Sequence, residues 1–295
     1  MDTAEFALLT RLVDGASPAE LVSAAPRPRA FEKLLAALRR NHFLVPAQPN
    51  LWRGTRLEKT FDYAEALGLD ATAAVRRLLT ARVVLLGMGG IGCVVLPHLL
   101  AAGVRDFTLI DFDRVSVSNL NRQFLFTPTD VGALKVDVAH RYVRSIDPEA
   151  SVETLVEPIL DAASLAGRLV RDGQPAALLV HGADTPPGRI DRIVAEAAGT
   201  CGVPVVSGGC RAFSGSWRAE STPTPAADPP LGEAPPITAL SFGPINSIVA
   251  DFMALDALHL LMGASPPSGG SLAALDFRSL TLRRTGGRPC QGSPS

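Results

Sequence analysis

A glycine-rich segment and the aspartate that follows it are the first residues whose types and spacing predict chemistry. Gly87-Met88-Gly89-Gly90-Ile91-Gly92 stands between an apolar run and a helical pattern. Glycines at such a place let the backbone approach a phosphate, and a helix N-terminus adds free N–H donors and a favourable dipole. Asp111 ends the next apolar run, where a carboxylate can accept hydrogen bonds from both ribose hydroxyls. These residues predict a nucleotide site, but they suit NAD as well as ATP.

The polar residues that come next favour phosphate chemistry over hydride transfer. Asn119, Arg122 and Lys135 place an amide, a guanidinium and an ammonium behind the glycine-rich segment. Hydride transfer has no use for two fixed cations beside the phosphates. Nucleotidyl transfer does, because negative charge builds on the phosphate oxygens in the transition state. Either cation alone would be an ordinary solvated charge, whereas the set together predicts a site that uses ATP.

Alternating strand and helix patterns predict the framework that positions these residues. The predicted strands are 82–86, 107–111, 151–156, 177–181 and 203–207, and the predicted helices between and after them are 91–102, 135–146, 188–199 and 245–262. Such alternation predicts an α/β fold with a doubly wound, mostly parallel sheet of the Rossmann type. The Pro- and Ala-rich segment 221–236 is predicted to be a crossover loop without regular structure.

Residues 1–48 predict a small helical unit ahead of this framework. Their apolar spacing indicates three short helices, and 42–45 is a candidate short strand. Together these elements resemble part of a winged helix-turn-helix. Residues 1–50 hold six basic and five acidic side chains, which is too even a balance for a nucleic-acid reader. We therefore expect two domains, 1–48 and 49–295. The first would either recognise a ligand other than nucleic acid or, as the alternative, only pack against the rest of the chain.

Composition excludes several classes of function. Of 295 residues, 47% are hydrophobic and 19% charged, and the formal net charge is −1. That charge gives no long-range field for nucleic acid or an anionic membrane. We expect no apolar stretch that approaches the roughly 20 residues of a membrane span and no signal peptide, hence a cytoplasmic protein. The four cysteines, which are Cys93, Cys201, Cys210 and Cys290, form no Cys-x-x-Cys pair, so no zinc site is expected.

The segment 82–148 resembles the ThiF/MoeB adenylyltransferases, relatives of the ubiquitin-activating enzymes, nearly throughout. The resemblance rests on the glycine-rich segment, Asp111-Phe112-Asp113, Asn119-Leu120-Asn121-Arg122-Gln123, Gly132 to Lys135, and Asp147-Pro148. Looser matches follow at Gly182-Ala183-Asp184, Arg189, 204–209 and 243–263. The likeness extends over about residues 53–263, and its first half is the more specific.

The resemblance implies a role for each of these residues. Gly89 would line the phosphates and Asp111 would hold the ribose, while Asn119, Arg122 and Lys135 would contact the triphosphate. Asp184 would bind Mg²⁺ beside the α-phosphate. In this family an arginine of the partner subunit completes the site, and Arg56, with Arg53 behind it, is the candidate here. The resemblance therefore implies a homodimer that needs ATP and Mg²⁺.

The implied reaction is attack of a substrate carboxylate on the α-phosphate of ATP, with release of pyrophosphate. Three departures from the family pattern limit what else is implied. Both zinc-binding Cys-x-x-Cys pairs of many relatives are absent, and Cys290-Gln291-Gly292-Ser293 looks like a remnant of one. The segment 211–289 holds no thioester cysteine, and Thr185 stands where Asn commonly follows the magnesium aspartate. We expect an acyl-adenylate made without zinc or thiol transfer, and a role for Cys210 stays open.

The N-terminal unit bears on which carboxylate is activated. Residues 1–48 resemble the helical part of the clamp that grips a precursor peptide in MccB-type and PaaA-type enzymes, and the sulfur-carrier enzymes lack such a unit. We therefore expect adenylation of a peptide carboxylate in ribosomal peptide natural-product biosynthesis. One alternative is activation of the C-terminal glycine of a ubiquitin-like sulfur carrier protein. The other is a nucleotide-binding partner subunit without catalysis. The sequence names neither the peptide nor the nucleophile that consumes the adenylate nor the product.

Overall fold

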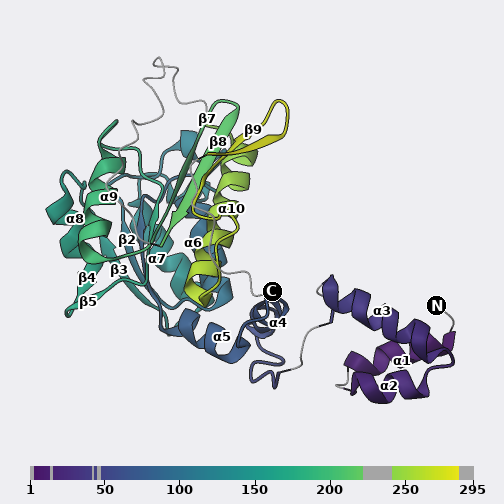
Figure 1. Ribbon diagram of the computed structural model, residues 1–295. Helices are drawn as coiled ribbons and strands as arrows, with labels where there is room; N and C mark the ends of the chain where they lie inside the picture. Colours follow the sequence, from purple (N-terminus) through teal and green to yellow (C-terminus); the bar gives the residue numbers. More distant parts are fainter. Residues whose placement is uncertain (1–2, 14–15, 42, 45–47, 222–240, 286–295) are drawn as a thin grey trace. The chain divides into compact units, whose positions relative to one another are not determined.

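The computed structural model describes residues 3–13, 16–41, 43–44, 48–221 and 241–285 (Figure 1). The chain divides into two compact units, Met1–Val75 and Arg76–Ser295. Each unit has its own apolar core, and each is described by itself below. The boundary that we expected after residue 48 stays a prediction.

The first unit is helical in its described part. Its helices are α1 (Thr3–Val13), α2 (Pro18–Ala24), α3 (Pro28–Arg40), α4 (Glu58–Ala66) and the first half of α5 (Ala71–Thr80). Leu21, Ala25, Phe31 and Leu35 form a small core among α1 to α3. The three predicted helices are present. Of the predicted strand 42–45, residues 43 and 44 form no strand, and the other two lie outside the described residues.

The second unit is built on a mixed sheet. Its described strands are β1 (Arg82–Leu86), β2 (Asp106–Ile110), β3 (Ser151–Leu155), β6 (Leu178–His181), β7 (Val205–Arg211), β8 (Ser214–Glu220), β9 (Leu272–Asp276) and β10 (Thr281–Thr285), in the order β10-β9-β8-β7-β6-β1-β2-β3. The five strands from β3 to β7 are parallel, and β8, β9 and β10 extend the sheet antiparallel. The predicted α/β fold is confirmed, with an antiparallel extension that the sequence did not predict.

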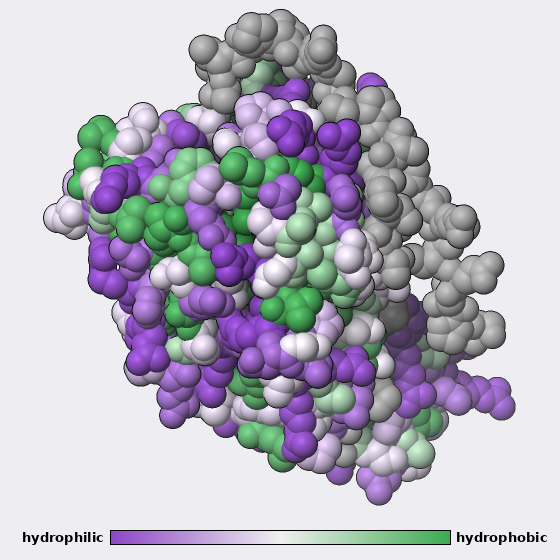
Figure 2. Space-filling view, turned by 90° about the vertical axis from the view of Figure 1, so that its left-hand side faces the viewer, coloured by the Kyte–Doolittle hydropathy of each residue, from purple (hydrophilic) through white to green (hydrophobic). Residues whose placement is uncertain are grey.

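Helices cover both faces of the parallel part (Figure 1). They are α6 (Gly92–Ala102), α7 (Lys135–Ile146), α8 (Ala162–Leu169), α9 (Ile190–Cys201) and α10 (Gly243–Met262). On one side α10 packs against α6, β7 and β8, and α7 contacts α6 and β3. On the other side α8 and α9 close a core with apolar residues of β1, β6 and β7. The outer surface on that side is largely hydrophilic, with apolar residues in small scattered groups (Figure 2).

The helix α10 contradicts the expectation that no apolar segment approaches the length of a membrane span. It has 20 residues, and its most apolar 18-residue window has a mean hydropathy of 1.4, enough to cross a membrane by length and composition alone. In the folded chain, 56% of its most apolar window is buried, against α6, β7 and β8. The apolar sequence of α10 is therefore that of a helix packed on a sheet. The expectation was wrong because the predicted helix 245–262 is itself 18 residues long, close to the length of a membrane span.

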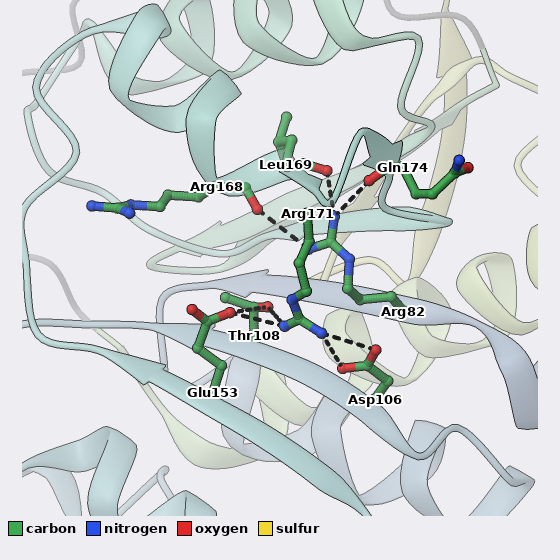
Figure 3. Close-up of polar contacts among 8 residues, drawn as sticks. All are labelled: Arg82, Asp106, Thr108, Glu153, Arg168, Leu169, Arg171 and Gln174. Carbon is green, nitrogen blue, oxygen red and sulfur yellow. Dashed lines mark hydrogen bonds and ion pairs between the residues drawn. The ribbon is translucent and has the colours of Figure 1, made fainter.

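Two arginines hold the hairpin of β4 (Val170–Arg171) and β5 (Gln174–Pro175) against the starting edge of the sheet (Figure 3). Arg82 donates to the carbonyl oxygens of Arg168, Leu169 and Gln174 at 3.3, 2.5 and 3.4 Å. Arg171 donates to both carboxylate oxygens of Asp106 at 2.9 and 3.0 Å, to Thr108 Oγ1 at 2.9 Å and to Glu153 Oε2 at 2.8 Å. This cluster joins the starts of β1, β2 and β3, at the edge opposite the glycine-rich segment.

We expect Arg171→Met to lower the free energy of unfolding by about 1–2 kcal/mol at pH 7, because buried Thr108 and two carboxylates lose their partner. The hydrogen bond from Arg171 lowers the pKa of Glu153. A lowered carboxyl pKa stabilises the fold above the unfolded pKa, about 4, and that stability is lost as pH falls through the folded pKa. In denaturant titrations, the stabilities of wild type and variant should therefore draw closer as pH falls below about 4, and the difference that comes from Thr108 should remain.

Arg168→Met is the matched control for this cluster. Arg168 also makes a two-pronged contact with a carboxylate, that of Glu157 at 2.7 and 3.0 Å, but among the described residues it has neither a second carboxylate nor a buried hydroxyl as a further hydrogen-bond partner. Its loss should cost no more than about 0.5 kcal/mol, as for other exposed ion pairs. Equal losses in the two variants would contradict a special role for Arg171 at this edge.

Candidate nucleotide and phosphate site

The glycine-rich segment joins the end of β1 to the start of α6. Gly87 has φ +96°, and a Cβ there would lie 2.9 Å from the backbone nitrogen of Ala183. A Cβ on Gly92 would collide with the carbonyl oxygen of Gly87. Packing within the chain therefore requires glycine at 87 and 92. A Cβ on Gly89 would meet only Gln123 Nε2, at an ordinary 3.7 Å, so packing within the chain does not require glycine at this position. The remaining reason for glycine is the close approach of a ligand to the backbone.

Asp111 directly follows β2 and braces the glycine-rich segment. Its Oδ2 accepts the N–H of Met88 at 2.6 Å, and its Oδ1 accepts the N–H of Asp113 at 2.8 Å. Burial raises the pKa of Asp111, while Lys135 and the two backbone N–H groups act in the opposite direction. The carboxylate thus lies beside the predicted phosphate-binding backbone, where a ribose would follow the phosphates. Its contact with ribose stays a prediction.

Lys135 is positioned by the loop between β2 and α7, residues 111–134, which we call the excursion. Lys135 N donates to Asp113 O at 3.0 Å, and Val115 N donates to Ala133 O at 2.9 Å, which closes the excursion like a short ladder. The closure places Lys135 Nζ 2.7 Å from Asp113 Oδ2, with only 7% of the lysine side chain exposed. A buried ammonium needs compensating negative charge, and a triphosphate would add to what the aspartate supplies.

Asn119 and Arg122 lie within this excursion: Asn119 ends a short 3₁₀ turn, Val117–Asn119, and Arg122 follows it three residues later. The side-chain oxygen of Asn119 accepts the N–H of Ser116 at 3.0 Å, so its carbonyl caps the turn and its amide nitrogen is the group that can donate to a phosphate. Arg122 Nη1 donates to Ser118 O at 2.8 Å and to Asn121 Oδ1 at 2.9 Å. Arg122 is half-buried and its guanidinium is anchored at Nη1, which leaves its other N–H groups to engage a ligand.

Asp184 lies on the loop that follows β6 and passes against the glycine-rich segment. A Cβ on Gly182 would lie 2.9 Å from Ile91 Cβ, so the two loops are in close contact. Asp184 is exposed, and its Oδ1 accepts Thr185 Oγ1 at 3.2 Å. One carboxylate beside phosphates is an ordinary Mg²⁺ environment, so this donor set fits that ion. The described residues hold no group of three or more His, Cys, Asp or Glu side chains for a metal, and the expected absence of zinc stays a prediction.

The structure brings most of the predicted residues to one edge of the sheet, where β1, β2 and β6 end. The glycine-rich segment, Asp111, the excursion with its amide and two cations, and the loop of Asp184 meet there. Arg53 and Arg56 are exposed and lie in the first unit, just before α4. Their contribution to the site of a partner subunit stays a prediction.

Three polar residues of this region were not assigned a role from the sequence. Gln123 is 3% exposed, would be the nearest neighbour of a side chain built at position 89, and has no partner for its Oε1. His181 ends β6 as a buried imidazole with Nε2 3.0 Å from Asp191 Oδ1. Asn246 is buried in the first turn of α10. For His181 and Asn246 the sequence offered one sign of a functional position. Each is a lone polar residue at the end of an apolar element.

Cys210, left open by the sequence, is placed on β7 beside the start of α10. Its thiol contacts the carbonyl oxygen of Ile245 at 3.4 Å. Burial raises the pKa of Cys210 to about 12. Because the thiolate is the reactive form, this environment disfavours a nucleophilic or redox role at neutral pH.

Comparison with known proteins agrees with this arrangement. The family model described as ThiF family matches residues 63–290. The chain belongs to the ThiF family. It is 35% identical over 226 residues to the sulfur carrier protein adenylyltransferase of Thermus thermophilus, a match that covers 70% of this chain and 81% of that protein. It is also 30% identical over 222 residues to the molybdopterin-synthase adenylyltransferase of Escherichia coli, covering 71% and 86%. This ThiF-family protein is an adenylyltransferase, and ATP is its implied nucleotide.

Solved structures resemble the chain over more of its length. E. coli MccB with AMPCPP and MccA has a TM-score of 0.78 at 23% identity, covering 94% of this chain and 85% of that one. The structure of PaaA has a TM-score of 0.68 at 22% identity, covering 90% and 84%. At such low identity these likenesses show a shared fold and nothing finer.

Proposed function

We propose that this adenylyltransferase uses ATP and Mg²⁺ to activate a carboxylate of a peptide, within ribosomal peptide natural-product biosynthesis. The observation that carries the proposal is the buried ammonium of Lys135, next to Asp111 and the glycine-rich segment. A fixed cation in such a place suits a reaction in which negative charge grows on phosphate oxygens.

The residues divide the work of adenylation as follows. The backbone of the glycine-rich segment and the start of α6 bind phosphate oxygens, and Asp111 orients the ribose. A carboxylate oxygen of the substrate attacks the α-phosphorus, and the bond to the bridging oxygen of pyrophosphate breaks. Arg122 and Lys135 stabilise charge on the phosphates during this step. Mg²⁺, held by Asp184, would supply further charge neutralisation. The attacking group belongs to the substrate, so no thiol of the protein is required.

The N-terminal helices favour a peptide as the substrate. They form a core of their own ahead of the ATP-binding unit, and the likeness to MccB, a structure of which holds MccA, extends over 94% of the chain. The names of the sequence relatives support the second candidate, a sulfur carrier protein whose C-terminal glycine is activated. A non-catalytic partner subunit is disfavoured, because Arg122, Lys135 and Asp184 are all retained at one edge of the sheet.

We expect deletion of residues 1–48 to raise the KM of the peptide substrate at least ~10-fold, because peptide recognition places its binding energy in such a unit. The dissociation constant of ATP should change less than about twofold, because the nucleotide contacts lie in the second unit. Calorimetric titrations with peptide and with ATP, on full-length and truncated protein, measure both quantities.

Circular dichroism and thermal melting of the truncated protein control for its folding. A folded truncation with unchanged peptide affinity would contradict the peptide proposal. In that case the C-terminal segment of a sulfur carrier protein becomes the favoured substrate. The same titration with a carrier protein that ends in Gly-Gly then tests that candidate.

A further inference from the structure

The first turn of α10 packs directly against the segment that carries Arg122. Gly243 is buried, and a Cβ built on it would lie 2.7 Å from the carbonyl oxygen of Asn121 and 2.9 Å from Phe124 Cζ. Backbone and ring are therefore in contact with the helix start, with no room for even a methyl group. The position of the Arg122 segment depends on where α10 begins.

Asn246, one turn further on, reaches the glycine-rich segment. It is 5% exposed, and a Cβ on Gly90 would lie only 2.9 Å from its Oδ1. Its Nδ2 donates to Ser241 Oγ at 2.8 Å and to the carbonyl oxygen of Phe242 at 2.9 Å. One amide thus fastens the start of α10 with its nitrogen and touches the phosphate-binding backbone with its oxygen.

The contact explains why residue 90 is a glycine. Gly87 has a positive φ that other residues rarely adopt, whereas Gly90 has none, so its backbone would accept alanine. What excludes alanine at 90 is the side chain of Asn246. An amide at a buried position of an apolar helix costs free energy unless it is hydrogen-bonded, so an apolar residue would be the simpler choice for packing alone.

We propose that Asn246 is a positioning residue for adenylation. It sets the distance between the glycine-rich segment and the Arg122 segment, because it contacts Gly90 directly and fixes the helix start that supports Arg122. The proposal rests on the nucleotide site proposed above. Asn246 touches neither phosphate nor carboxylate itself, so its loss should weaken the alignment of two groups that do.

The test adds a methyl group at position 90 and removes the side-chain amide at position 246, first separately and then together. Gly90→Ala should raise the KM of ATP at least ~10-fold, because its new methyl group must displace Asn246. Asn246→Ala alone should raise that KM about fivefold. In the double variant the two Cβ atoms would be 3.5 Å apart, an ordinary contact, so its KM should return to within about twofold of Asn246→Ala. Ser247→Ala, the next residue on the same helix, is the control and should match wild type.

A second pair of variants tests the hydrogen bond from Asn246 Nδ2 to Ser241. This test remains available if the Gly90→Ala variant does not fold. Ser241→Ala and Asn246→Leu each remove the bond at 2.8 Å, and the double variant should be no worse than the poorer single variant. The dissociation constant of ATP from calorimetry provides a measurement independent of turnover. Strictly additive effects in both pairs, or a lower Tm with unchanged ATP affinity, would overturn the positioning role. Absence of ATP binding in wild type would instead overturn the proposed nucleotide site.

Discussion

Lys135→Ala is expected to slow ATP–pyrophosphate exchange by at least ~100-fold, the usual loss for one charge contact made in the transition state. The ammonium is buried and fixed by Asp113 at 2.7 Å, so it is in place before charge develops on the phosphates. Water cannot replace it at the same position without reorganisation. Arg122→Ala should give a loss of similar size, because it removes the second cation of the set.

Lys59→Ala is the matched control for this experiment. Lys59 also makes an ion pair with an aspartate at 2.7 Å, that of Asp62, but it is exposed and lies in the first unit. Its removal should leave exchange within about twofold of wild type, since exposed pairs of this kind contribute little. Wild-type rates in both Lys135→Ala and Arg122→Ala would contradict the assignment of the active site.

Asp184→Ala and Arg56→Ala are each expected to abolish most exchange, yet a mixture of the two should recover activity. If Arg56 serves the site of the partner subunit, a hybrid dimer holds one site with both residues intact and one site with neither. With random subunit exchange, half of the dimers are hybrids, and one of the two sites in each hybrid is intact. About a quarter of wild-type activity should therefore return.

This mixture also tests the proposed homodimer and the Mg²⁺ role of Asp184. Subunit exchange is followed by mass spectrometry of differently tagged chains. No recovery despite exchange would exclude a shared site built with Arg56, and Arg53→Ala in the same scheme then tests the neighbouring candidate. For Asp184→Asn, we expect the Mg²⁺ concentration for half-maximal rate to rise at least ~10-fold.

The parallel half of the fold was predictable from sequence because its signals are local and strong. Residues 82–86 and 135–146 form the strand and the helix that were predicted with those bounds. Buried parallel strands are continuous apolar runs, which is the clearest strand signal a sequence offers. The helix α9 was displaced by two residues, as Ile190–Cys201 and not 188–199, which is the usual uncertainty at helix ends.

The antiparallel extension was missed for a physical reason. The strand β8, Ser214–Glu220, reads Ser-Gly-Ser-Trp-Arg-Ala-Glu, and five of its seven residues are glycine, serine or charged. It is stabilised by pairing with β7 and β9 and by α10 on one face, and none of these contacts is local in sequence. The small strand β10 has no buried residue at all.

The residues of the candidate site that belong to sequence motifs were predictable. The contacts that form only in the folded chain were not. The glycine-rich segment, Asp111 and Lys135 meet at one edge of the sheet because parallel strands end there together. The pairing of Lys135 with Asp113 depends on the closed excursion between them. The contact of Asn246 with Gly90 joins residues that are 156 positions apart, since 246 minus 90 is 156, and no spacing rule reaches that far.

The most direct test of the central claim is ATP–pyrophosphate exchange by the wild-type protein with two versions of one substrate. A candidate precursor peptide or carrier protein is supplied once with its carboxylates free and once with every carboxylate converted to an amide. The account predicts Mg²⁺-dependent exchange with the free acid and none with the amide, because the attacking oxygen belongs to one of those carboxylates. Equal exchange with both versions, or with neither while ATP is bound, would contradict carboxylate adenylation by this protein.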